Sequence, residues 1–242
     1  MKNSLIFLFL LLNINESIKS LKNDLIQPEE NYRKIMPVQL RNYILKKNVY
    51  IVDTRNNTIS NQGYLENSLL LPLTMNYEKF FPIVIKEGSS VILICDNDNY
   101  RDAIKKTIDF GRYYFLGYAI YDEIPKDSHL KIKKAVYNEN DLESIQKLVE
   151  EGKYIVDIRE IEEYKETGVI KEANLLPLST FRKEYTTLPK DKDIYFYCKS
   201  GGRALLGMTY VQRAGYKNKL IVMRGGMTKT IQEGYPLIPY SK

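Results

Sequence analysis

The chain has 242 residues, of which 44% are hydrophobic and 27% are charged. These fractions are typical of a globular protein and exclude a coiled coil or a fully disordered chain, while the length suits one large domain or two small ones. The 36 basic and 30 acidic residues give a net charge of +6, but the lysines are scattered and form no stripe with interleaved aromatic residues. We therefore expect no nucleic-acid binding, and we interpret the excess charge as a solvated surface that mildly favours small anions.

The first twenty residues have the pattern of a secretory signal. Lys2 precedes an unbroken apolar run from Leu5 to Leu12, and the polar segment Asn13 to Ser20 follows. The run is too short to span a bilayer, which takes about 20 apolar residues, but it suits the apolar core of a signal peptide. We expect residues 1–20 to be cleaved near Ser20, which predicts a periplasmic or extracellular protein without stable membrane insertion. The alternative is a buried N-terminal segment of a cytoplasmic protein.

The chain repeats itself. Tyr50-Ile-Val-Asp-Thr-Arg55 returns as Tyr154-Ile-Val-Asp-Ile-Arg159, about 104 residues further along. Two more blocks return in the same order and at nearly the same spacing: Gly63 to Leu73 returns as Gly168 to Leu178, and Val91 to Cys95 returns as Ile194 to Cys198. Three blocks in one order predict two homologous domains, residues 21–125 and residues 126–242, each of ordinary domain size.

Short apolar runs rich in Ile, Val, Tyr and Phe predict buried strands, and the amphipathic segments between them predict helices. In chain order the expected elements are strands at Tyr50–Val52 and Val91–Ile94, a core or edge strand within Gly111–Gly117, a polar linker at 126–134 with the single histidine His129, a helix at Asn140–Glu151, a strand at Tyr154–Val156, a helix at Ile161–Thr167, a strand at Ile194–Tyr197, a helix at Arg203–Ala214 and a strand at Leu220–Met223. This alternation predicts an α/β fold in which each domain has a central parallel sheet flanked by helices.

Ligands of such sheets bind beyond the carboxyl ends of the strands, and both cysteines lie at such an end. Cys95 and Cys198 occupy equivalent positions in separate domains, where their α-carbons are too far apart for a disulfide. We therefore expect two free thiols.

The stretch Cys198-Lys-Ser-Gly-Gly-Arg203 lies between a predicted strand and a predicted helix. Gly201 and Gly202 allow the backbone to take positive φ angles and to turn its amide groups inward, which makes a cradle for an anion. The following helix adds the positive end of its dipole, and Lys199 and Arg203 add whole charges. Because such surroundings favour a thiolate, Cys198 is predicted to be a nucleophile beside an anionic substrate such as thiosulfate, mercaptopyruvate or a phosphate ester. The alternative is a small buried hydrophobe at a strand end.

From Tyr154 to Pro236 the chain resembles the rhodanese family. The matching motifs are Val156-Asp-Ile-Arg159 with Glu163-Tyr164, Gly168 to Leu178, the loop Cys198 to Arg203, Ala214-Gly-Tyr216, Arg224-Gly-Gly226 and Gly234-Tyr-Pro236. The resemblance implies a three-layer fold, and a cysteine that accepts sulfane sulfur from a small anionic donor and passes it to a thiol or to cyanide. Two positions depart from the family pattern: Val169 stands where a histidine is usual, and Thr230 stands where a tryptophan is usual.

Carried over by position, the resemblance makes Cys198 the sulfur carrier of a thiosulfate sulfurtransferase-like enzyme. Lys199, Ser200, Gly201, Gly202 and Arg203 would bind the substrate or its persulfide. Arg159 is a candidate for lining the pocket, whereas Asp157 is expected to hold the loop scaffold by hydrogen bonds. We expect no cofactor and no metal, since one histidine cannot build the metal site of a fused metallo-hydrolase.

The corresponding loop of the first domain is Cys95-Asp-Asn-Asp-Asn-Tyr-Arg101-Asp102. Three carboxylates would repel an anionic substrate and disfavour a thiolate, so we expect this domain to be catalytically silent. The five residues between Cys95 and Arg101 resemble the loop length of cysteine-dependent phosphatases, but the aspartates have the same sign of charge as phosphate.

Two other functions remain open for the whole chain. One is a non-enzymatic module that binds a partner or carries sulfur for another enzyme. The other is a cysteine phosphatase at Cys198, which is disfavoured because only four residues separate Cys198 from Arg203.

Overall fold

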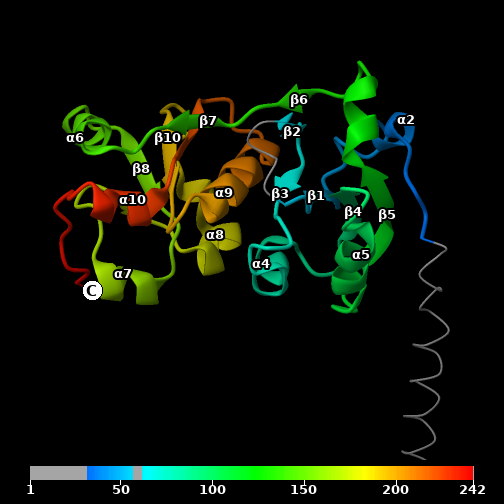
Figure 1. Cartoon of the computed structure of the whole chain (residues 1–242), viewed down its shortest axis with the longest axis horizontal. Helices are drawn as coiled ribbons and strands as arrows, with labels where there is room; N and C mark the ends of the chain where they lie inside the picture. Colours follow the sequence, from blue (N-terminus) through cyan, green and yellow to red (C-terminus); the bar gives the residue numbers. More distant parts are fainter. Residues whose placement is uncertain (1–31, 57–61, 242) are drawn as a thin grey trace, which may run out of the picture. The chain divides into compact units, whose positions relative to one another are not determined.

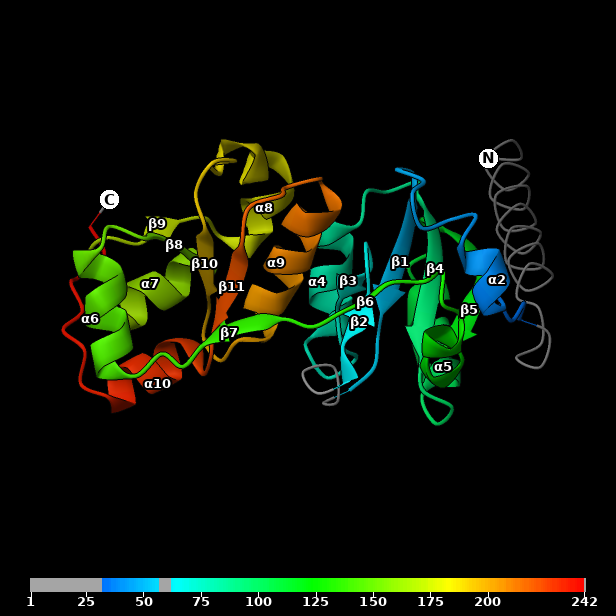
Figure 2. The same cartoon turned by 90° about the horizontal axis from the view of Figure 1, so that it is seen from above.

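The structure is a computed structural model that describes residues 32–56 and 62–241. The predicted signal segment, residues 1–20, lies outside the described residues. Contacts divide the chain into a first unit of residues 1–34 and a second unit, Ile35–Lys242. The elements described below all belong to the second unit, which contains two parallel sheets (Figures 1 and 2).

The first sheet has four parallel strands in the order β3-β1-β4-β5. They are β1 (Val49–Asp53), β3 (Leu69–Leu70), β4 (Ser90–Cys95) and β5 (Tyr114–Ile120). The predicted strands at Tyr50–Val52 and Val91–Ile94 are thus confirmed and extend slightly further at both ends. The segment Gly111–Gly117 contributes the edge strand β5, as expected.

The second sheet has five parallel strands in the order β7-β11-β10-β8-β9. They are β7 (Val136–Asn138), β8 (Tyr154–Asp157), β9 (Asn174–Leu175), β10 (Ile194–Tyr197) and β11 (Leu220–Met223). Apart from the extra outer strand β7, this order repeats that of the first sheet, strand for strand along the sequence. The predicted α/β fold with two parallel sheets is confirmed.

Helices cover both faces of the second sheet, as a buried parallel sheet requires. Along β10, Tyr197 packs with α6 and α10 on one face, while Phe196 contacts Phe181 of α8 on the other face, on which α9 also packs (Figure 1). Alternation of side chains along a strand produces this division. The helices of the described chain are α2 (Pro37–Leu40), α4 (Tyr77–Val84), α5 (Tyr100–Ile108), η2 (Tyr121–Lys126), α6 (Leu142–Glu150), α7 (Ile161–Thr167), α8 (Leu178–Glu184), η3 (Tyr185–Thr187), α9 (Gly202–Arg213) and α10 (Gly226–Gln232).

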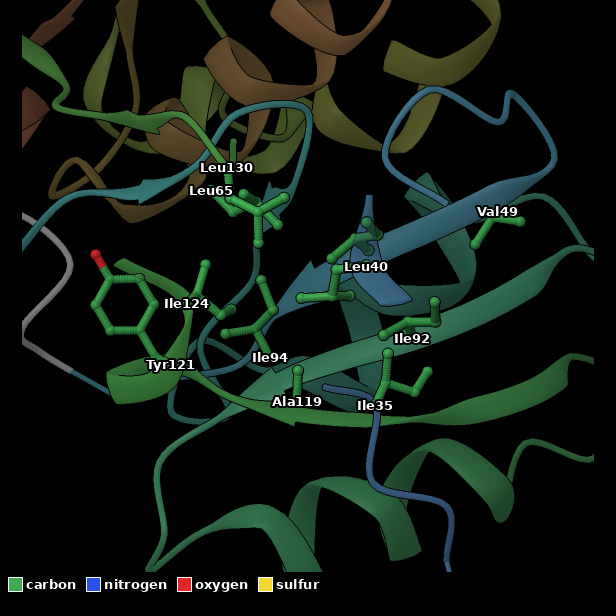
Figure 3. Close-up of a cluster of buried hydrophobic side chains, with 11 residues drawn as sticks. Ile35, Leu40, Val49, Leu65, Ile92, Ile94, Ala119, Tyr121, Ile124 and Leu130 are labelled. Carbon is green, nitrogen blue, oxygen red and sulfur yellow. The ribbon is translucent and has the colours of Figure 1, made fainter. Parts of the chain in front are cut away.

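A cluster of buried hydrophobic side chains fills one face of the first sheet (Figure 3). Ile51 of β1 is paired in register with Ile92 of β4, and both are 0% exposed. Leu40 of α2 and Ile124 of η2 close this core from outside the sheet. The opposite face is covered by α4 and α5, which are joined by a hydrogen bond between the Tyr77 and Thr107 hydroxyls at 2.7 Å.

The predicted polar linker, residues 126–134, is more ordered than its composition suggests. Within it, β6 (Ile132–Lys133) pairs antiparallel with β2 (Tyr64–Leu65), and Leu130 is 5% exposed in the core of the first sheet. His129 lies at the surface beside Asp127. A few apolar residues therefore anchor this otherwise polar connection.

Helix α9 also contacts the first sheet. The Thr209 hydroxyl accepts a hydrogen bond from the N–H of Leu70 in β3, at 3.2 Å. The guanidinium of Arg213 donates to the carbonyls of Lys46, Lys47 and Val49. The same helix thus begins at the Cys198 loop and ends against the start of β1, and hydrogen bonds from its side chains to backbone groups connect it to the first sheet.

Within the described part of the chain, we find no helix of the length and apolar character needed to cross a membrane.

Replacing Ile92 with Ala tests the core of the first sheet. We expect the free energy of unfolding to fall by about 3 kcal/mol, because the substitution leaves a cavity among fully buried side chains. Leu45 is 81% exposed, so Leu45→Ala is the matched control and should change stability by less than about 0.5 kcal/mol. Urea unfolding followed by far-ultraviolet circular dichroism measures both, and equal effects would contradict this description of the core.

Candidate active site

Cys198 directly follows β10, and α9 begins four residues later at Gly202. Gly201 has a φ of +105°, in the left-handed region that glycine tolerates, and its N–H donates a hydrogen bond to Cys198 Sγ at 3.1 Å. The cysteine is only 1% exposed. The chain therefore turns tightly around the sulfur and places a backbone hydrogen-bond donor against it.

The first N–H groups of α10 hold the outer side of this loop. Met227 N donates to the Cys198 carbonyl at 2.8 Å, and Thr228 N donates to the Lys199 carbonyl at 3.0 Å. The first N–H groups of a helix have no acceptor within the helix and can therefore bind acceptors elsewhere. In a trans peptide, the carbonyl and the next N–H point in opposite directions. Binding of both carbonyls by α10 therefore turns the N–H groups of Lys199 and Ser200 away from that helix.

The close approach of α10 to the loop depends on Gly226. Its φ is +53°, and a Cβ added there would lie 2.0 Å from the Cys198 carbonyl oxygen. No side chain can occupy this space without moving the loop. The Arg224-Gly-Gly226 motif noted in the sequence thus has a direct packing purpose.

The two cations of the loop have different surroundings. Lys199 is exposed, and its ammonium forms no salt bridge within the described residues. Arg203 instead donates through both terminal nitrogens to Glu163 of α7, at 2.5 and 2.6 Å. Burial lowers the pKa of Arg203, but the hydrogen bonds to Glu163 more than offset this and hold it above its usual value. The charge of Arg203 is therefore matched by a carboxylate of the same domain.

Arg159 lies behind the loop in a buried ion pair with Asp157. Its guanidinium donates to Asp157 at 2.7 to 3.1 Å, to the Thr167 hydroxyl at 2.6 Å and to the Gly168 carbonyl at 2.9 Å. Hydrogen bonds to Asp157 outweigh the opposing effect of burial and raise the pKa of Arg159. These contacts tie the end of β8 to the segment that follows α7.

The first domain has the same arrangement. Arg55 donates to Asp53 at 2.7 and 2.8 Å and to the Gly63 carbonyl at 2.8 Å. Since Gly63 and Gly168 are equivalent positions of the repeat, the pair recurs with the same partners in a domain whose cysteine loop is acidic. Because this Asp-Arg pair occurs in both domains, it indicates a structural role in the fold rather than a role specific to the Cys198 loop.

The structure thus brings together most of the residues that the sequence predicts for the site. Cys198, Lys199, Ser200, Gly201, Gly202 and Arg203 form one continuous turn at the carboxyl end of β10. Arg159 and Lys199 both line an adjoining cavity of about 80 Å³. The hydrogen bonds of the Arg159 guanidinium, however, are directed to Asp157 and to the backbone. Asp157 holds Arg159 and the local backbone, as expected.

Three residues that contact the loop are not among the predicted site residues. Glu163 appears in a recognised motif, but nothing local indicates that it pairs with Arg203, 40 positions away. Met75 lies against the loop, since a Cβ on Gly202 would be 2.8 Å from Met75 Sδ. The ring of Phe80 lies 6.0 Å from the Arg203 guanidinium carbon. Met75 and Phe80 belong to the first sequence repeat, and no sequence pattern marks them as neighbours of Cys198.

The equivalent cysteine of the first domain has a different environment. Cys95 is 0% exposed, and its sulfur accepts a hydrogen bond from the Thr54 hydroxyl at 3.4 Å. Burial, with smaller contributions from Asp53 and Asp96, raises the pKa of Cys95 to about 12. The thiol is therefore protonated throughout the neutral range. Neither cysteine is in a disulfide, as expected.

Metal binding has no candidate site in residues 32–56 and 62–241, where no three acidic, histidine or cysteine side chains are grouped for a metal ion.

Comparison with known proteins finds rhodanese-like and sulfurtransferase matches to part of the chain. The model of the rhodanese-like domain matches residues 141–233. A sulfurtransferase of Allochromatium vinosum is 34% identical over 103 residues, covering 42% of this chain and 94% of that protein. The putative sulfurtransferase YtwF of Bacillus subtilis is 35% identical over 78 residues, covering 32% of this chain and 73% of that protein. A solved rhodanese-like domain protein of Staphylococcus aureus is 25% identical, covers 45% of this chain and 100% of its own, and has a TM-score of 0.38.

Replacing Gly226 with Ala tests the packing of α10 on the loop. Gly234 also has a positive φ, of +74°, but has open space around it, so Gly234→Ala measures the cost of left-handed backbone alone, about 1 kcal/mol. We expect Gly226→Ala to destabilise the protein by roughly 3 kcal/mol, since the clash with the Cys198 carbonyl adds to the backbone strain. Thermal unfolding measures both variants. Similar losses would show that α10 does not constrain the loop.

The raised pKa of Cys95 predicts selective alkylation. A thiol with a pKa of about 12 is uncharged at all lower pH values, and its thiolate accumulates only as the pH approaches that value. Iodoacetamide at pH 8 should therefore modify Cys198 well before Cys95 in the folded protein. Peptide mass spectrometry measures both sites, and urea-unfolded protein, in which both should react, is the control. Faster modification of Cys95 would contradict this assignment.

Proposed function

Because the chain belongs to the rhodanese family, we propose that it is a sulfurtransferase in which Cys198 carries the sulfur. The observation that carries the proposal is the hydrogen bond from Gly201 N–H to Cys198 Sγ, in a loop whose outer carbonyls are bound by α10. A backbone donor stabilises negative charge on this sulfur without a histidine general base. The named sulfurtransferases to which part of the chain is similar support the assignment.

The proposed reaction has two displacements at sulfur. The Cys198 thiolate attacks the outer, sulfane sulfur of an anionic donor; the new bond joins Sγ to that sulfur, and the bond within the donor breaks. The electron pair of the broken bond leaves with the rest of the donor, as sulfite when the donor is thiosulfate. A thiol or cyanide acceptor then attacks the outer sulfur of the persulfide and restores the Cys198 thiolate. No external oxidant or reductant is needed, since sulfane sulfur is transferred as such.

The residues of the loop have distinct roles in this proposal. The N–H groups from Lys199 to Arg203 stabilise the thiolate and the terminal charge of the persulfide. The exposed ammonium of Lys199 attracts the donor. Asp157 and Arg159 fix the backbone below the loop, because their charges are already matched to each other.

We also propose that the two sheets are tandem rhodanese-like domains, residues 21–125 and 126–242, of which the first is catalytically silent. The common strand order and the recurring Asp-Arg pair support a shared origin. Cys95 lacks the features of the Cys198 loop, since its sulfur is bonded to a side-chain hydroxyl and neighbouring aspartates disfavour its thiolate. The first domain instead supplies Met75 and Phe80 at the Cys198 loop.

The cysteine phosphatase alternative has less support. A phosphatase arginine must turn its guanidinium to the phosphate, whereas both terminal nitrogens of Arg203 are bound to Glu163. The alternative of a non-enzymatic binding or sulfur-carrier module is distinguished from the enzyme by the absence of catalytic turnover of donor and acceptor.

The test is sulfur transfer by the full chain from thiosulfate to cyanide, measured as thiocyanate. Cys198→Ser should lower the rate by about a thousandfold or more, because the nucleophile is lost, whereas Cys95→Ser should leave it within about twofold. Mass spectrometry of the protein after donor treatment should find the mass of one added sulfur atom on Cys198.

The possible results separate the candidates. A sulfur adduct on Cys198 without turnover would replace the enzyme by a sulfur-carrier module. Absence of both adduct and turnover with thiosulfate and with an alkyl persulfide would overturn the proposed function. Equal loss of activity in the two cysteine variants would contradict the silent first domain.

A further inference from the structure

The charge at the Cys198 loop is smaller than its sequence suggests. The sequence places two cations there, Lys199 and Arg203, which together would suit a dianion. In the structure, Arg203 forms a bidentate pair with Glu163, and the side chains of this pair are only 11% and 23% exposed. Lys199 is thus the one loop cation, within the described chain, that has no carboxylate partner.

Glu163 is held in this position from two sides. Its carboxylate also accepts a hydrogen bond from the Glu160 N–H at 2.9 Å, which closes a capping box at the start of α7. Burial raises the pKa of Glu163, but hydrogen bonds from Arg203 and the Glu160 N–H outweigh this and lower it below its usual value. The carboxylate is therefore ionised at neutral pH and cancels the charge of Arg203 where a donor would bind.

The remaining surroundings suit a donor with one charge and an organic part. Glu166, a further carboxylate, lines the same small cavity as Lys199. On another side of the loop, the thioether of Met75 packs against Gly202. An alkyl group can gain dispersion contacts with a thioether, whereas the sulfite half of thiosulfate would gain none and prefers to remain hydrated.

We propose that Glu163 determines donor specificity by neutralising Arg203, so that the site favours monoanionic organic persulfides over dianionic thiosulfate. This inference rests on the proposed sulfurtransferase function. With a persulfide donor, the thiolate of Cys198 attacks R–S–S⁻, forming Cys198–S–S⁻ and releasing R–S⁻, and the reacting groups carry a total charge of −2. With thiosulfate the same step carries −3 and releases sulfite, so it depends more strongly on a second unmatched cation.

The experiment compares thiosulfate with 2-hydroxyethyl persulfide as donors to the full chain and its Glu163→Gln variant. Glutamine keeps the acceptor that the capping box needs but removes the charge, which releases Arg203 to bind the donor. We expect kcat/KM for thiosulfate to rise by about fivefold, mainly through a lower KM, and kcat/KM for the persulfide to change by less than about twofold. Glu162→Gln is the matched control, because Glu162 is exposed on the same helix and does not contact Arg203.

Two further variants locate the cause. In the double variant Glu163→Gln/Arg203→Gln, the gain with thiosulfate should disappear, since the released cation is gone. Arg203→Gln alone leaves the Glu163 carboxylate without its partner, so thiosulfate transfer should fall more than persulfide transfer. This second result tests the proposal even if Glu163→Gln does not fold.

The outcomes distinguish this inference from the function on which it rests. A change in the ratio of kcat/KM for the two donors in the stated directions supports the role of Glu163. If Glu163→Gln changes both donors equally, or if Glu162→Gln changes the ratio as much, Glu163 is only structural and the proposal fails while the sulfurtransferase remains. If neither donor forms a persulfide on Cys198 of the unmodified protein, the proposed function fails and this inference fails with it.

Discussion

The site depends on the hydrogen bonds between the N-terminus of α10 and the carbonyls of Cys198 and Lys199. The backbone carbonyls of a tight turn around a sulfur atom need hydrogen-bond donors, because a buried carbonyl without a partner destabilises the fold. Here the spare N–H groups of one helix satisfy them, and Gly226 allows that helix to approach closely enough. The loop N–H groups are then available to negative charge on the sulfur. These two backbone hydrogen bonds thus link the N-terminus of α10, the Arg224-Gly-Gly226 motif and the environment of Cys198.

The two domains use a common scaffold with different loops. Each has a buried Asp-Arg pair that ties the end of its first long strand to an equivalent glycine carbonyl. Above this scaffold, Cys198 faces a backbone N–H, whereas Cys95 faces a hydroxyl and has aspartates nearby. The buried pairs are common to both domains, whereas the residues that follow the two cysteines differ. The recurring pair also explains why Arg159 is better placed to support the loop than to bind substrate.

Charge pairing changes the chemical interpretation of the site. Arg203 would be an anion-binding group if it were unmatched, but a carboxylate from α7 occupies both of its terminal nitrogens. The surface of the loop therefore combines one exposed cation with nearby carboxylates and a thioether contributed by the first domain. Under our proposal, such a surface favours donors of low charge with an organic part. The first domain thus contributes side chains to the surroundings of the Cys198 loop.

The sequence by itself determined the repeat, the α/β class and the position of the glycine-rich loop that follows Cys198. Strands at Ile194–Tyr197 and Leu220–Met223 and the helix at Ile161–Thr167 were predicted with their observed bounds, because dense apolar runs and local capping fix such elements. Some short elements were not predicted: β7 has only three residues and α10 only seven, too few for a long periodic pattern. The partners of the site, Glu163 with Arg203 and Met75 with Gly202, were decided only by the tertiary structure. These contacts join residues tens of positions apart, and their existence depends on how helices pack on sheets rather than on any local pattern.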